Sequence, residues 1–85
     1  MTKDQLTALL SDTASLFRLG QEGKANAQYQ QIIGQVQAWI AASKNKEAYM
    51  PVLTQLLNAQ ERKDWLDLAD TLEYELTALI QHTDN

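Results

Sequence analysis

Apolar residues recur at helical spacing along almost the whole chain. In the first segment they lie on one side of a helix, at Leu6, Leu9, Leu10, Ala14, Leu16 and Phe17. This periodicity predicts an amphipathic helix over 3–19 with one buried stripe. Thr2 and Gln5 have the spacing of a capping box at its start, and Gly20 accepts the left-handed conformation that ends many helices.

A second stripe predicts a helix over 24–42. Its apolar positions are Tyr29, Ile32, Ile33, Val36, Trp39 and Ile40. Glutamines occupy the opposite side, which we interpret as a hydrated face because amides favour helix without adding charge. Gly34 costs about 1 kcal/mol relative to alanine inside a helix, which a closely packed neighbour would offset.

The third predicted helix covers 47–60. Its apolar stripe consists of Tyr49, Val52, Leu53, Leu56 and Leu57. Pro51 suits the first turn of a helix, since further inside it removes a hydrogen bond and clashes with the preceding turn. We therefore expect regular helix only from about Met50, after an irregular turn from Glu47, and the sequence leaves open whether Pro51 starts or kinks the helix.

The fourth predicted helix covers 64–81. Asp64 has the character of an N-cap, and Asp67 follows it at the third position. The apolar stripe of this helix consists of Trp65, Leu68, Ala69, Leu72, Leu76, Leu79 and Ile80.

These four segments predict an all-α fold, a single domain over 1–85 that forms a small up-down-up-down four-helix bundle. The short connections favour antiparallel neighbours, and no segment alternates like a strand. A chain of 85 residues buries only about 60% of the surface that its unfolded form exposes. Tight helix packing or self-association is therefore expected to supply the remaining stabilisation.

Composition narrows the classes of function. Eleven acids against seven Lys and Arg give a formal net charge of −4, which opposes binding to nucleic acid and to anionic membrane surfaces. No apolar run approaches the length of a membrane span, and the first residues do not resemble a secretion signal, so we expect a cytoplasmic protein. The absence of cysteine excludes a disulfide framework and a thiolate zinc site.

No arrangement of residues indicates catalysis, a metal site or a cofactor. The glycine-containing run 20–24 lacks the spacing and the preceding strand of a phosphate-binding loop, and it lacks the sheet and basic groove of a KH domain. His82 is the single histidine. Asp67, Asp70 and Glu73 fall outside the apolar stripe, which favours a solvated acidic face over a cation site. We expect neither an enzyme nor a protein that binds a small-molecule substrate.

A second line of residues on the fourth segment is the candidate binding surface. Leu66, Asp70 and Tyr74 follow one another at four-residue intervals, turned away from the apolar stripe, and Trp65 lies beside them in the first turn. These residues either flank the core or form an edge that binds a protein partner. At such an edge, tyrosine contributes both apolar area and a hydroxyl.

Residues 57–80 resemble the small helical flagellar export chaperones of the FliT type. In both, a helix ends with an alanine, here Ala59, and a short turn leads to an Asp-Trp pair, here Asp64 and Trp65. A long helix with leucines at helical spacing follows. Residues 69–76 are also similar to a sequence in small uncharacterised helical bacterial proteins, a likeness that implies no activity.

The chaperone resemblance implies that a groove between the last helices sequesters an amphipathic helix of a secretion substrate. The matching or adjacent positions here are Trp65, Leu66, Leu72 and Tyr74. The chain is shorter than those chaperones and leaves little room after Ile80 for a regulatory C-terminal helix, so the resemblance does not extend to regulated release.

The sequence therefore favours a non-enzymatic helical interaction module that binds itself or one protein partner. We expect a helix-in-groove contact through Trp65, Leu66, Asp70 and Tyr74. The alternative is an obligate structural homodimer whose bundle is completed across a two-fold axis and that has no groove-binding partner.

Overall fold

The computed structural model describes residues 2–82, and over this range the chain forms helices and short turns without a strand. Helix α1 spans Lys3–Arg18, α2 spans Glu22–Ala41 and α3 spans Lys46–Glu61. The fourth helix consists of α4 (Trp65–Asp70), the π-helical segment η1 (Thr71–Leu76) and α5 (Thr77–His82), which follow one another without a break. We call these three parts together the last helix. The predicted all-α fold with four helices is confirmed.

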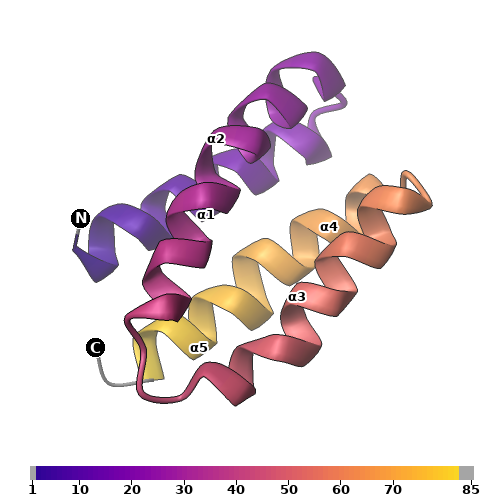
Figure 1. The fold of residues 1–85 in the computed structure, drawn as a ribbon. Helices are drawn as coiled ribbons and strands as arrows, with labels where there is room; N and C mark the ends of the chain where they lie inside the picture. Colours follow the sequence, from indigo (N-terminus) through magenta and orange to yellow (C-terminus); the bar gives the residue numbers. More distant parts are fainter. Residues whose placement is uncertain (1, 83–85) are drawn as a thin grey trace.

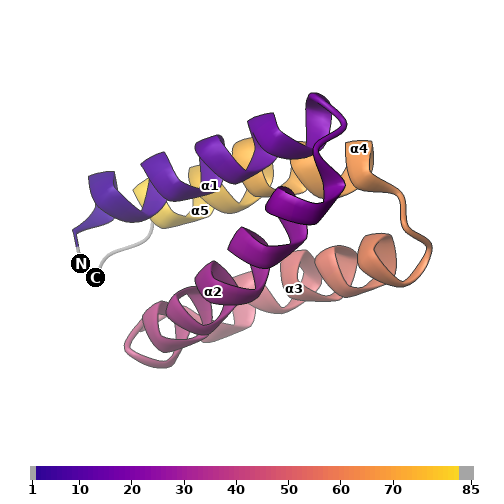
Figure 2. The same cartoon turned by 90° about the horizontal axis from the view of Figure 1, so that it is seen from above.

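The helices follow the predicted up-down-up-down order. α1 and the last helix lie side by side in one layer, and α3 and the end of α2 form the other (Figure 2). α1 packs against α2 and against all three parts of the last helix, and α3 packs against α4 and η1. α2 and α3 share a connecting turn and diverge from it (Figure 1). Of the neighbouring pairs of helices, α2 and α3 therefore have the least extensive contact.

The helix ends agree with the caps that the sequence predicts. Gln5 N donates to Thr2 Oγ1 at 3.1 Å and Thr2 N donates to Gln5 Oε1 at 2.9 Å, which completes the capping box. Gly20 follows α1 with a φ of 77°, a left-handed conformation that glycine adopts without a steric penalty. The Asp64 carboxylate accepts a hydrogen bond from Asp67 N at 3.2 Å at the start of the last helix.

The predicted start of α2 and the predicted irregular turn before Met50 in α3 are wrong, whereas the other predicted boundaries differ from the structure by no more than one residue. α2 begins at Glu22 rather than at 24. α3 is helical from Lys46, so Pro51 lies inside it instead of near its start. Pro51 cannot donate a hydrogen bond to the Glu47 carbonyl, but both residues are exposed, so water can hydrate that group.

The core lies between the inward faces of all four helices. Its most completely buried large side chains are Leu6, Leu10, Tyr29, Ile32, Tyr49, Leu56, Leu68, Leu72, Leu76 and Ile80. Other members of the predicted stripes are only partly buried at the margin, namely Leu9, Leu16, Ile33, Trp39, Leu53, Trp65 and Leu79. Leu57 is the exception, since it was expected in the stripe of α3 and is exposed.

The π-helical segment explains how the last helix buries four residues at strict four-residue spacing. In an α-helix, four residues turn the chain by about 40° more than a full circle, so Leu68, Leu72, Leu76 and Ile80 would drift by about 120° around the axis. All four are fully buried. A π turn holds more residues than an α turn because its hydrogen bonds reach five residues back, and it removes this drift. Thr77 Oγ1 also donates to the Leu72 carbonyl, at 3.0 Å.

Gly34 does not mark a close helix contact. A Cβ atom at this position would meet nothing within 4 Å, so the expected close neighbour is missing and the conformational cost of glycine is not offset by packing.

Candidate functional site

The residues predicted to bind a partner lie in two different environments. Leu66 and Tyr74 are 64% and 61% exposed, and Asp70 lies between them on the surface. We call the surface formed by Leu66, Asp70 and Tyr74 the outer face of the last helix. Trp65 is partly buried, and its indole ring stacks on Phe17 with 5.4 Å between the ring centroids. Trp65 therefore belongs to the margin of the core, and the other three share one surface.

Arg18 extends from the end of α1 onto this outer face. Its Nη2 donates to Asp70 Oδ1 at 2.7 Å, and its Nη1 donates to Glu73 Oε1. The guanidinium carbon also lies 5.4 Å from the ring centroid of Tyr74, within reach of a cation–π interaction. Hydrogen bonds with Asp70 and then Glu73 raise the pKa of Arg18 above its usual value.

Arg18 is a site residue that the sequence analysis missed. It lies 52 residues before Asp70 in the chain, so no local motif joins the two. The predicted up-down-up-down bundle nevertheless indicated this contact. Its first and fourth helices are antiparallel, so the end of the first lies beside the start of the fourth. Arg18 is also the single basic residue between Lys3 and Lys24, which leaves it as the natural partner of acids there.

Carboxylates on the other flank of the last helix contact α3. Gln55 Nε2 donates to Asp67 Oδ1 and Glu75 Oε1, each at 3.4 Å. Arg62 Nη2 pairs with Asp67 Oδ2 at 3.1 Å. Polar groups from both α1 and α3 thus hold the last helix along its two edges, while the outer face between them stays open to solvent.

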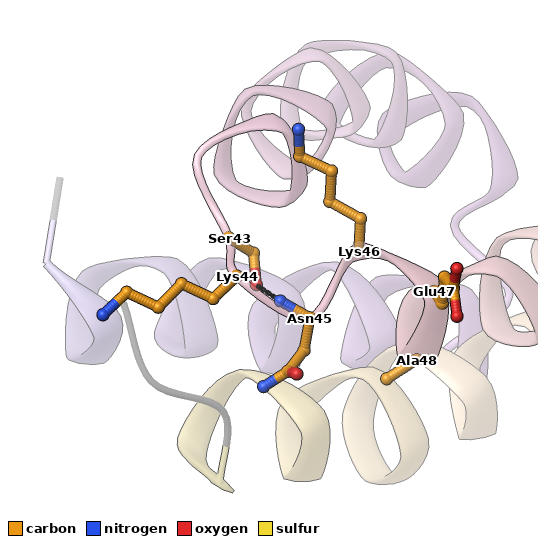
Figure 3. Close-up of a pocket in the computed structure, with 6 residues that line it drawn as sticks. All are labelled: Ser43, Lys44, Asn45, Lys46, Glu47 and Ala48. Atoms are coloured by element: carbon orange, nitrogen blue, oxygen red, sulfur yellow. Dashed lines mark hydrogen bonds between the residues drawn. The ribbon is translucent and has the colours of Figure 1, made fainter.

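The connection between α2 and α3 forms an open depression of about 580 Å³, lined by residues 43–48. Ser43 Oγ accepts a hydrogen bond from Asn45 N at 3.1 Å. The side chains of Lys44, Asn45 and Lys46 point in different directions rather than toward a common point (Figure 3). Acid–base or nucleophilic chemistry requires groups that converge on one reacting atom, so this depression has no catalytic arrangement.

Residues 2–82 contain neither a metal-binding group of side chains nor a helix suited to cross a membrane. No group of three or more His, Asp or Glu in this part of the chain lies close enough together to hold a metal ion. No helix that the structure describes is long and apolar enough to cross a membrane.

Comparison with protein-family models, with curated proteins and with solved structures finds no match to this chain. The resemblance of residues 57–80 to the FliT-type chaperones therefore rests on those residues alone.

Proposed function

We propose that this protein is a non-enzymatic interaction module that binds an amphipathic helix of a partner protein along the outer face of its last helix. The observation that supports this proposal is the exposure of Leu66 and Tyr74, two large side chains that the monomer leaves outside its core. Apolar side chains at helical spacing are what one amphipathic helix presents when it packs against another.

The geometry of the outer face suits such a contact. Leu66 and Tyr74 are eight residues apart, so about 12 Å of helix separates them, close to two turns of a bound helix. Asp70 and Glu73 hold Arg18 between these anchors, which fixes the direction of its planar guanidinium. A rigid surface loses less side-chain entropy when a partner binds.

The charge around the outer face indicates the charge of the helix that binds there. The segment 61–75 contains the acids Glu61, Asp64, Asp67, Asp70, Glu73 and Glu75. Two basic residues of the same segment and Arg18 offset only part of this charge. A partner helix with Lys or Arg beside its apolar residues therefore approaches with favourable electrostatics, whereas an acidic helix is repelled. The FliT-type resemblance adds a chaperone-like role, in which the protein sequesters the bound helix.

Capture followed by direct binding tests this proposal. The wild type and a Leu66→Asp, Tyr74→Asp double variant are used to capture proteins from bacterial lysate. An Ala27→Asp, Ala38→Asp variant serves as the matched control, because both positions are exposed on α2 and lie outside the outer face of the last helix. We expect one partner to be captured by the wild type and the control and lost in the double variant. With that partner purified, the double change is expected to weaken binding by about 100-fold, as loss of interface anchors does.

Circular dichroism of all three proteins shows whether the fold is intact. Equal capture by the wild type and the double variant would overturn the assignment of the outer face.

A further inference from the structure

The charged side chains are distributed unevenly over the four helices. No Asp, Glu, Lys or Arg occurs in residues 25–42, which make up most of α2, or in 48–60, which make up most of α3. The charges lie on α1, on the last helix and near the turns. Soluble surfaces carry charge at about 25–35% of their positions, so two helices whose charges are confined to their ends require an explanation.

The flank of α2 that faces α1 is identified by its contacts. Gln28 Nε2 donates to Asp12 Oδ2 at 2.9 Å and to Thr13 Oγ1 at 2.8 Å. Gln35 and Trp39 line a depression together with Leu6 of α1. The helical period therefore places the opposite flank on the side away from α1. That flank consists of Asn26, Gln30, Ile33 and Gln37.

The same reasoning orients α3. Gln55 and Arg62 contact the last helix, so their flank faces it. The opposite flank, on the side of α2, consists of Met50, Leu53, Leu57 and Gln60. Met50 and Leu57 are 56% and 61% exposed, and Leu53 is partly buried.

These two flanks lie where α2 and α3 diverge and have the least extensive contact of the neighbouring helix pairs (Figure 1). We call them together the α2–α3 face, made up of Asn26, Gln30, Ile33, Gln37, Met50, Leu53, Leu57 and Gln60. Four of these side chains are apolar and four are amides. Lys24, Lys46 and Glu61 lie only at its ends. An uncharged centre containing methionine, bordered by charges, is typical of the buried part of a protein interface.

Amides make this face complementary to itself. A two-fold axis brings a surface against its own copy, so a charged surface meets like charge across the axis. A glutamine side chain both donates and accepts hydrogen bonds, and it can therefore pair with the same residue type in a second copy. With a net charge of −4 on each chain, this uncharged face is also where two copies approach with the least repulsion.

The size of the face approaches the area that a stable dimer needs. A specific interface buries about 800 Å² on each partner, which is roughly a sixth of the 4958 Å² accessible surface of this protein. α2 and α3 have 20 and 16 residues. They are therefore about 30 Å and 24 Å long and about 10 Å wide, and together they present about 500 Å².

From these observations we infer that the α2–α3 face binds a second copy of this chain, forming a homodimer about a two-fold axis. The interface is separate from the outer face of the last helix, so this inference does not depend on the proposed function.

Sedimentation equilibrium from micromolar to millimolar concentration tests the homodimer. The wild type is expected to change from the 9.6 kDa monomer to twice that mass as concentration rises. A Met50→Lys, Leu57→Lys variant is expected to raise the dissociation constant by about 100-fold or more, because the interface desolvates both lysines. Both positions are exposed in the monomer, so circular dichroism is expected to show an unchanged fold.

Two further variants separate the α2–α3 face from general effects. Met50→Leu with Leu57→Met keeps the apolar surface and is expected to dimerise as the wild type does. Leu66→Lys with Tyr74→Lys changes only the outer face of the last helix, and its dimer is expected to persist. A wild type that stays monomeric at millimolar concentration overturns the inference, as does a dimer that the lysine pair on α3 leaves unchanged.

Discussion

Tyr29 shows at the scale of one residue how the core accepts a polar group. Its side chain is buried, and its ring meets Phe17 edge to face with 6.4 Å between the centroids. The hydroxyl is buried without a hydrogen-bond partner in residues 2–82. An unpaired buried donor costs about 1–3 kcal/mol, while the ring contributes a large apolar area. The residue therefore stabilises the fold through its ring and destabilises it through its oxygen.

Tyr29→Phe keeps the ring and removes the unpaired hydroxyl. We expect the free energy of unfolding to rise by about 1 kcal/mol, the lower end of the desolvation cost of such a group. Urea denaturation followed by circular dichroism measures this change. A loss of stability would mean that the hydroxyl has a partner that the structure does not show.

The same residue predicts a pH dependence. Burial raises the pKa of Tyr29 above its usual 10.0, because the ionised form loses its hydration. As pH rises, the unfolded chain releases the Tyr29 proton before the folded chain does. The contribution of this protonation difference to the free energy of unfolding is therefore complete below about pH 10 and is lost as pH rises above it. We expect the free energy of unfolding to fall more steeply between about pH 9 and pH 11 in the wild type than in Tyr29→Phe. If the free energy of unfolding fell equally steeply in both proteins over this pH range, the raised pKa of Tyr29 would be contradicted.

At the scale of one element, the last helix combines α-helical and π-helical parts. It contributes one side to the core and presents another side to solvent. Its α-helical ends and π-helical middle keep Leu68, Leu72, Leu76 and Ile80 in the core. The same chain presents Leu66 and Tyr74 to solvent. Because the two sets differ in burial, they are expected to differ in their effect on stability.

Substitution by alanine measures that difference. Leu72→Ala and Ile80→Ala each remove a fully buried side chain and are expected to lower the free energy of unfolding by about 2–5 kcal/mol, through lost burial and the cavity that remains. Leu66→Ala changes an exposed position and is expected to stay within about 0.5 kcal/mol of the wild type. If Leu66→Ala lowered the free energy of unfolding as much as Ile80→Ala does, the assignment of Leu66 to the exposed side of the last helix would be wrong.

At the scale of the whole molecule, the charges are separated by helix. The last helix and its partners on α1 and α3 hold the ion pairs that the structure describes, between Arg18 or Arg62 and acids of the last helix. The α2–α3 face is uncharged. The two proposed contacts therefore have different electrostatics, since a basic helix at the outer face is attracted by charge and a second copy at the α2–α3 face is not.

Salt is expected to change the two contacts in opposite directions. Raising the ionic strength from about 0.05 M to 0.5 M screens the attraction between the acidic segment 61–75 around the outer face and a basic partner helix, so that binding weakens. The same change screens the repulsion between two chains of net charge −4, so the homodimer becomes slightly tighter. Titration calorimetry of the partner and sedimentation of the protein alone measure the two responses. A dimer that weakens as much as the partner complex would show that charge pairs hold its interface.

Much of this structure follows from short-range patterns in the sequence. The helical period of apolar residues determined the four helices, and Thr2, Gly20 and Asp64 determined three of their ends, because a cap involves residues only a few positions apart. The sequence did not predict that Pro51 would lie inside α3. A favourable helical context on both sides outweighed the loss of one hydrogen bond at an exposed carbonyl.

The tertiary structure decided which side of each helix stays exposed. Leu57 belongs to an apolar stripe by spacing, but it is exposed because the last helix packs against the other flank of α3. Arg18 reaches Asp70 and Glu73 only after two distant helices meet. Periodicity along a chain determines which residues share a helix face, whereas packing between helices determines what covers that face. The sequence therefore determined the helices of this protein, and the fold decided which of their faces remain available for binding.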